Sequence, residues 1–110
     1  MSDGSNIEEV RSSLITLFDS DLLDITAQAA KNGKEYLKQL SMIATEYGIF
    51  DFVRDLLRSG CSIREVKMGE PLGSRGIAYR VIDPVRRELY IKVKIEEGTA
   101  WIISFHRSKH

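Results

Sequence analysis

The 110-residue chain has one cysteine, two prolines and no net charge at neutral pH. Cys61 has no partner for an internal disulfide, which fits a reducing, cytoplasmic location. No apolar run approaches the ~18 residues of a membrane span. The N-terminal segment has no basic stretch followed by an apolar one, so we expect no secretory signal. These absences predict a cytoplasmic protein that does not act at a membrane.

Common metal and nucleotide motifs are also missing from the sequence. Both histidines, His106 and His110, lie near the C-terminus, and no cluster of Cys and His has metal-ligand spacing. Gly69, Gly73 and Gly76 lie between predicted strands, whereas a glycine-rich phosphate loop would precede a helix. We therefore expect no metal and no cofactor.

The zero net charge hides a difference between two parts of the chain. Residues 1–62 hold six Lys and Arg against ten Asp and Glu, whereas residues 63–110 hold ten against six. A basic C-terminal part indicates an anionic partner. Ordinary solvated Lys and Arg on the face of a sheet are the alternative explanation.

The first 60 residues have the apolar spacing of helices. The first helix has Ser5 or Asn6 as a candidate cap. Arg58-Ser59-Gly60 is a typical helix end, with a cation in the last turn and glycine beyond it. Asn32-Gly33 and Gly48 mark the ends of two further helices, although the second and third could be continuous. The expected helices span residues 7–18, 22–33, 36–48 and 50–58.

From Ile63 onward the apolar residues alternate with polar ones, which is the period of a strand. The pattern predicts strands at 63–68, 77–82, 86–96 and 99–105, with Glu97-Gly98 as a hairpin turn. The last strand is apolar on both faces, which predicts that it is central or covered by helices, with Trp101 and Phe105 in the core. Helices followed by a meander of strands indicate an α+β fold.

We therefore expect one domain, residues 1–110. Three to four N-terminal helices (1–60) would pack on a four-stranded antiparallel sheet (61–110).

One face of the long strand combines an aromatic ring with positive charge. Tyr90, Lys92 and Lys94 alternate with apolar residues, and the next strand ends in His106 and Arg107. Such cations and an aromatic ring can bind a phosphodiester strand. An imidazole can transfer protons near neutral pH. These residues are the candidate functional site.

The segments IREVKMG, AYRVI, LYIKVKI and WIISFHRSKH, all within residues 63–110, resemble the C-terminal half of the MqsR-type messenger-RNA interferases. These enzymes are toxins of bacterial toxin–antitoxin pairs. The resemblance implies a RelE-like fold with helices packed on a curved antiparallel sheet. It also implies a cytoplasmic, metal-independent endoribonuclease whose partners are RNA, a cognate antitoxin protein and the ribosome.

The resemblance implies roles for residues at matching positions. The family's lysine in the first strand falls on Lys67, its tyrosine in the long strand on Tyr90, and its terminal lysine on His106. The family's glutamine has no counterpart, because that position is Gly76 or Ile77. His106 would be the general acid or base, Tyr90 would stack on a base or contact the phosphate, and Lys67 would hold the phosphate. Further RNA-binding cations would be Lys92, Lys94, Arg107, Arg75 and Arg80.

Two other functions remain open at this point. A non-catalytic module could use the same basic face to bind a protein, and the acidic helical part favours this alternative because it lowers affinity for RNA. An RNA-binding protein without catalysis would bind in a salt-dependent manner and leave the RNA intact. Each site residue also has a purely structural explanation, with Lys92 and Lys94 as a solvated sheet face and His106 as a surface residue.

Overall fold

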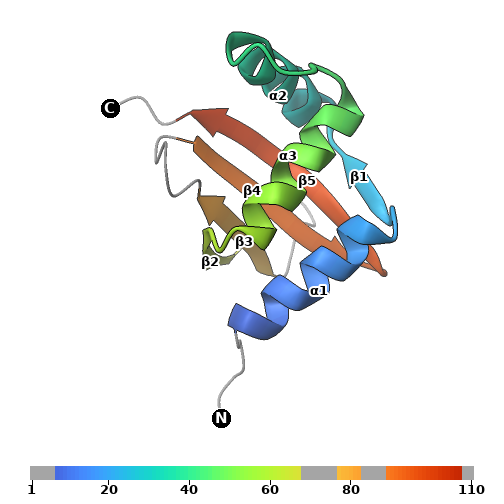
Figure 1. Ribbon diagram of the computed structural model, residues 1–110. Coiled ribbons are helices and arrows are strands. Elements are labelled where there is room, and N and C mark those ends of the chain that lie inside the picture. Colours follow the sequence, from blue (N-terminus) through green and yellow to red (C-terminus); the bar gives the residue numbers. More distant parts are fainter. Residues whose placement is uncertain (1–6, 68–76, 83–88, 108–110) are drawn as a thin grey trace.

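The computed structural model describes residues 7–67, 77–82 and 89–107. The strands within them form one sheet in the order β1-β5-β4-β3-β2, and the helices pack on one face of it (Figure 1). The α+β class is confirmed. The elements are α1 (Ile7–Asp19), β1 (Leu23–Ile25), α2 (Ala27–Gln39), α3 (Glu46–Arg58), β2 (Ser62–Lys67), β3 (Ile77–Ile82), β4 (Leu89–Glu96) and β5 (Thr99–Arg107).

The expected meander is present, because β2, β3, β4 and β5 pair antiparallel in chain order. The described strand ends lie within two residues of the expected ones, while positions 68 and 86–88 lie outside the described residues. Glu97 (φ 52°) and Gly98 (φ 75°) both have positive φ, which is typical of a type I′ hairpin turn. The central position of the last strand is confirmed, because β5 lies between β1 and β4.

The four-stranded, purely antiparallel sheet was wrong, because a fifth strand pairs parallel to β5. This strand, β1, aligns Leu23 with Ala100 and Ile25 with Ile102. The apolar spacing predicts that residues 22–25 begin a helix and that all strands lie after residue 60. A three-residue strand is too short to show a period of two, and only its partner in β5 selects the extended conformation.

The expected helix ends at Gly33 and Gly48 were also wrong. Gly33 lies inside α2, where a Cβ atom would come 2.7 Å from Ile49 Cδ1 of α3. Gly48 lies in the first turn of α3, where a Cβ atom would come 2.1 Å from the Ile43 carbonyl oxygen. Both glycines thus allow close packing within or beside a helix. The described residues contain three helices, and α3 ends at Arg58 before Gly60 (φ 86°), as expected.

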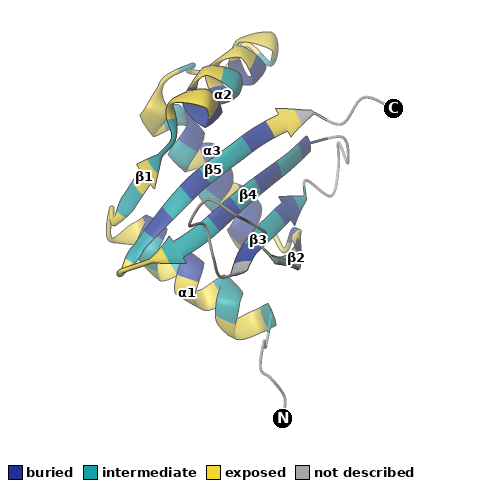
Figure 2. Cartoon of the chain, turned by 180° about the vertical axis from the view of Figure 1, so that it is seen from behind, coloured by how far each residue is buried: buried dark blue, intermediate teal, exposed yellow. Residues whose placement is uncertain are grey.

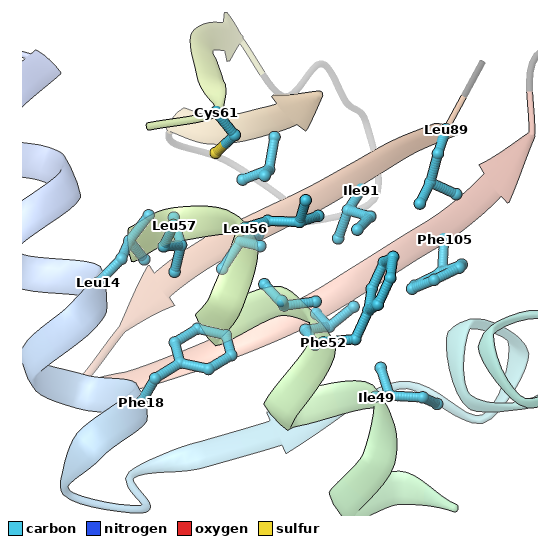
Figure 3. Close-up of a cluster of buried hydrophobic side chains, with 14 of the residues drawn as sticks. Leu14, Phe18, Ile49, Phe52, Leu56, Leu57, Cys61, Leu89, Ile91 and Phe105 are labelled. Atoms are coloured by element: carbon cyan, nitrogen blue, oxygen red, sulfur yellow. The ribbon is translucent and has the colours of Figure 1, made fainter. Parts of the chain in front are cut away.

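The core lies between the sheet and the helices (Figure 3). Helix α3 crosses the sheet diagonally (Figure 1), and its apolar side chains lie against those of β4 and β5 (Figure 3). Burial of each such side chain contributes about 1.5–3 kcal/mol. No helix among the described residues is long and apolar enough to cross a membrane. The fully buried residues of the core include Leu14, Phe18, Leu37, Ile49, Val53, Leu57, Leu89, Ile91, Val93 and Ile102.

Candidate nucleic-acid interface

The sheet face turned away from the helices carries most of the predicted site residues, and we call it the polar face. No described helix crosses this face (Figure 2). In β4 the buried residues Leu89, Ile91 and Val93 point to the helices, so the alternate residues Tyr90 and Lys92 belong to the polar face. The cross-strand register then assigns Arg64, Arg80, Lys94, Trp101, Ser104, His106 and, on β1, Asp24 to the same face.

Four residues from three neighbouring strands meet at one end of the polar face, and we call them the His106 cluster: Arg80, Tyr90, Ser104 and His106. Tyr90 and His106 are directly opposed on β4 and β5, with ring centroids 6.0 Å apart. Arg80 Cζ lies 5.2 Å from the centroid of the Tyr90 ring, a cation–π distance. Ser104 Oγ lies 3.2 Å from His106 Nδ1, and the imidazole tautomer decides which of the two donates.

The orientation of the imidazole follows from this contact. Because Nδ1 faces Ser104, Nε2 is the ring nitrogen that His106 leaves for a ligand. The His106 side chain is exposed. The cluster therefore combines a solvent-accessible proton-transfer group, a phenol and a guanidinium, which is a set that can bind and act on a phosphodiester.

A row of cations crosses the sheet beside the cluster. Arg64 of β2 pairs with Arg80 of β3, and Arg80 pairs with Lys92 of β4. Like charges that face each other across strands are destabilising. Among the described residues, no carboxylate forms an ion pair with any of the three, whereas Lys94 Nζ lies 3.6 Å from Glu96 Oε1. The row is therefore a local concentration of positive charge in a chain of zero net charge.

A β-bulge changes the side chains that β5 presents. Lys92 pairs with Ser104 and Val93 pairs with Ile102, so Ile103 is an extra residue on β5. The bulge allows both Ile103 and Ser104 to line a hollow of about 480 Å³ on the polar face. Trp101 also lines this hollow. Its expected place in the core was wrong, whereas Phe105 is buried as expected.

The structure does not bring Lys67 together with Tyr90 and His106. Lys67 pairs with Ile77 at the start of β3, and Tyr90 pairs with Ile82 at its end. Five residues of strand separate these positions, which is roughly 17 Å at about 3.4 Å per residue.

The remaining cations that the sequence predicts for the site lie at different places in the structure. Arg80 and Lys92 lie in the row described above, and Lys94 lies beside the hollow. The backbone of Arg107 pairs with that of Leu89. Arg75 lies outside the described residues.

Sequence reasoning missed Arg64, Ser104 and Trp101 as residues of the site. Arg64 could have been found from its alternation with Ile63, but its register with Arg80 depends on the loop that joins their strands. Trp101 could have been found from the hairpin register, which pairs it with Lys94, whereas the place of Ser104 depends on the bulge, which leaves no clear pattern in the sequence. Within the described ranges, no group of three or more His, Cys, Asp or Glu is arranged to hold a metal ion.

Comparisons of the chain with protein-family models, with curated proteins and with solved structures found no match. The function must therefore be argued from the residues of the polar face.

Proposed function

We propose that the chain is a metal-independent endoribonuclease that binds single-stranded RNA on the polar face and cleaves it at the His106 cluster. The observation that carries this proposal is the meeting of an imidazole, a phenol and a guanidinium on one exposed sheet face. The cations Arg64 and Lys92 extend the positive charge beyond the cluster. Together they match the aromatic and cationic surfaces that bind single strands.

The reaction would be an internal transfer within the RNA. The 2′-oxygen attacks the adjacent phosphorus while its proton passes to His106 Nε2, and the bond from phosphorus to the 5′-oxygen breaks. The Tyr90 hydroxyl gives a proton to the departing oxygen. Arg80 holds two phosphate oxygens and stabilises the charge of the pentacoordinate state, a contribution that is often the largest in such sites. The products are a 2′,3′-cyclic phosphate and a 5′-hydroxyl end.

We further propose that the fold is RelE-like and that the chain acts as a toxin, on the ribosome, with a cognate antitoxin. The antiparallel meander β2–β5 with helices on one face supports the first of these proposals. The edge strand β2 has β3 as its only described neighbour, so an antitoxin segment could add a strand there. Lys67 is not part of the proposed catalytic set, because its register position lies at the far end of β3.

The test is cleavage of a 5′-labelled single-stranded RNA by the purified chain in the presence of EDTA. We expect cleavage with cyclic-phosphate ends. His106→Ala should lower the rate about 10²–10⁴-fold, the usual contribution of positioned proton transfer, and Tyr90→Phe should also lower it. His110→Ala, at the chain's other histidine, is the matched control and should keep the full rate. Intact RNA at high protein concentration, or full activity of His106→Ala, would contradict the proposal.

One observation favours a second function, a non-catalytic module that binds a protein. Met42, Ile43 and Tyr47 are exposed apolar residues around the α2–α3 connection, and Tyr47 is 78% exposed. Neighbouring exposed apolar side chains are typical of contact surfaces. This function predicts a stable protein complex and no cleavage in the assay above.

A further inference from the structure

The hollow on the polar face has a different composition from the His106 cluster. It lies over β4 and β5 next to Thr26, the residue that caps α2, and measures about 480 Å³. Pockets of this size are large enough for a small organic ligand. Its walls include Trp101 and Ile103 from β5 and Lys92, Lys94 and Glu96 from β4. The hollow is therefore apolar on one side and charged on the other, where two ammonium groups outnumber one carboxylate.

Trp101 is an unusual residue for this face. It is the only tryptophan of the chain, and it lies opposite Lys94, whereas its neighbours Ala100 and Ile102 are fully buried under the helices. Its register position belongs to the polar face, which no described helix crosses (Figure 2). A large aromatic surface left without a covering element gains most from a flat ligand that stacks on it.

The polar groups around the hollow complement the edge and the phosphate of a nucleotide. Lys92 has no ion pair within the described residues, and Lys94 is paired with Glu96 at 3.6 Å with its side chain only 14% exposed. Thr26 and Ser104 add hydroxyl groups. Ammonium groups donate to base acceptors or to phosphate oxygens, and hydroxyls both donate and accept.

Ser104 connects the hollow to the His106 cluster. The same side chain lines the hollow and lies 3.2 Å from His106 Nδ1. An RNA strand that passes from the hollow to the imidazole of His106 therefore crosses Ser104. Along β4 the two places are four residues apart, from Lys94 to Tyr90, which is about 14 Å.

We propose that this hollow holds one unpaired nucleobase of the RNA strand, stacked on Trp101, while the phosphate to be cleaved lies at the His106 cluster. This inference rests on the proposed function and adds a base-binding subsite to it. The subsite selects single strands, because a base inside a duplex is already stacked on both faces and cannot enter. It also gives the cleavage site a fixed distance from the bound base.

The experiment uses the fluorescence of Trp101, which reports on this hollow alone because the chain has no other tryptophan. The probe is a 2′-O-methyl single strand, which lacks the attacking hydroxyl and is not cleaved. We expect saturable quenching by this strand, and at least tenfold weaker binding by an abasic strand of the same length. A duplex of the same sequence should not quench. This comparison uses the unaltered protein, so it does not depend on the folding of a variant.

Variants of Trp101 then measure how much its ring contributes to RNA binding, apart from the rest of the polar face. By anisotropy of a labelled strand, Trp101→Ala should weaken binding about 10–100-fold, the range of one lost stacking contact, and Trp101→Phe should restore most of it. Tyr47→Ala removes an exposed ring on α3 and is the matched control, with no expected change. Equal binding of the base-containing and abasic strands, or of Trp101→Ala and the unaltered chain, would overturn the subsite.

The two proposals fail in different ways. Quenching by the strand with no cleavage of ordinary RNA would overturn the nuclease and support the subsite. Cleavage that depends on His106 with no quenching of Trp101 would support the nuclease and overturn the subsite.

Discussion

At the scale of single residues, the polar face carries charges that the fold does not require. Arg80 lies opposite Arg64 on one side and Lys92 on the other, and like charges directly opposite each other are destabilising. The Arg80–Tyr90 contact offsets part of this cost for one of them. A surface that is destabilising by itself becomes favourable when an anion binds to it. These like-charge pairs are therefore a stronger argument for an anionic ligand than the number of basic residues is.

The raised pKa of Tyr79 leads to a prediction of how the free energy of unfolding depends on pH. Burial, followed by the nearby charge of Glu65, raises the pKa of Tyr79 above its ordinary value of 10.0. The folded state therefore favours the neutral phenol, so the stabilising effect is complete below pH 10 and is lost as the pH rises through the folded-state pKa. We expect Tyr79→Phe to lose less stability than the unaltered chain between pH 9 and pH 11.

Urea unfolding at several pH values tests this prediction. Tyr47→Phe is the matched control, because Tyr47 is 78% exposed and removal of its hydroxyl should leave the alkaline decline unchanged. Glu65→Gln should make the decline smaller, since it removes the second cause of the shift. An alkaline decline that is identical in Tyr79→Phe and in the unaltered chain would show that other groups control it.

At the scale of elements, the contact between α2 and α3 depends on the missing side chain of Gly33. A Cβ atom there would come 2.7 Å from Ile49 Cδ1 and 3.4 Å from Phe105 Cδ2. Gly33→Ala gains about 1 kcal/mol of helix propensity but overpacks a core in which Ile49 is fully buried, at a cost of about 1–3 kcal/mol. We expect a net loss of up to about 2 kcal/mol.

A double-mutant cycle shows whether the clash is the cause. Ile49→Val removes the Cδ1 methyl and alone should cost about 0.5–1.5 kcal/mol. Combined with Gly33→Ala, it should cost less than the sum of the two, because the new Cβ atom fills the vacated space. Gly33→Ala with Ile15→Val of α1 is the control pair and should be additive. Additivity in both pairs, measured by urea unfolding, would show that Gly33 is not needed for this contact.

The same glycine shows why part of the fold could be predicted from the sequence and part could not. Helix α1, the C-terminal end of α3, strand β3 and the Glu97-Gly98 turn are set by local patterns, and these predictions are confirmed. Gly33 has the same local signature as a helix end, and only its contact with Ile49 distinguishes the two. Strand β1 depends in the same way on its partner in β5.

The candidate site could also be predicted only in part, because alternation along one strand is visible in the sequence and the register between strands is not. The alternation in β4 predicted that Tyr90, Lys92 and Lys94 share a face. The pairing of Tyr90 with His106 depends on register, which the hairpin turn sets but the bulge at Ile103 then shifts. A bulge arises from the way two strands pair, so the sequence of neither strand alone predicts it. The resemblance placed Lys67 beside Tyr90, and the register separates the two.

At the scale of the whole molecule, zero net charge means that attraction of RNA from a distance should be weak. Binding would then depend on the few cations that touch the strand, and not on the total charge. For single strands the logarithm of affinity falls with the logarithm of salt concentration, with a slope of about −0.7 per neutralised phosphate. Contacts from Arg64, Arg80 and Lys92 predict a slope of roughly −2.

Two single-charge variants separate local contact from total charge. Arg64→Gln removes a cation from the polar face, and Lys34→Gln removes one from α2, where it lines a different hollow. Both change the net charge equally. We expect Arg64→Gln to reduce the size of the slope by about 0.7 and Lys34→Gln to leave it nearly unchanged, as measured by anisotropy with an uncleavable strand between 50 and 300 mM salt. Equal changes in the two variants would mean that RNA responds to the overall charge of the chain, and the polar face would then lose its claim to be the binding surface.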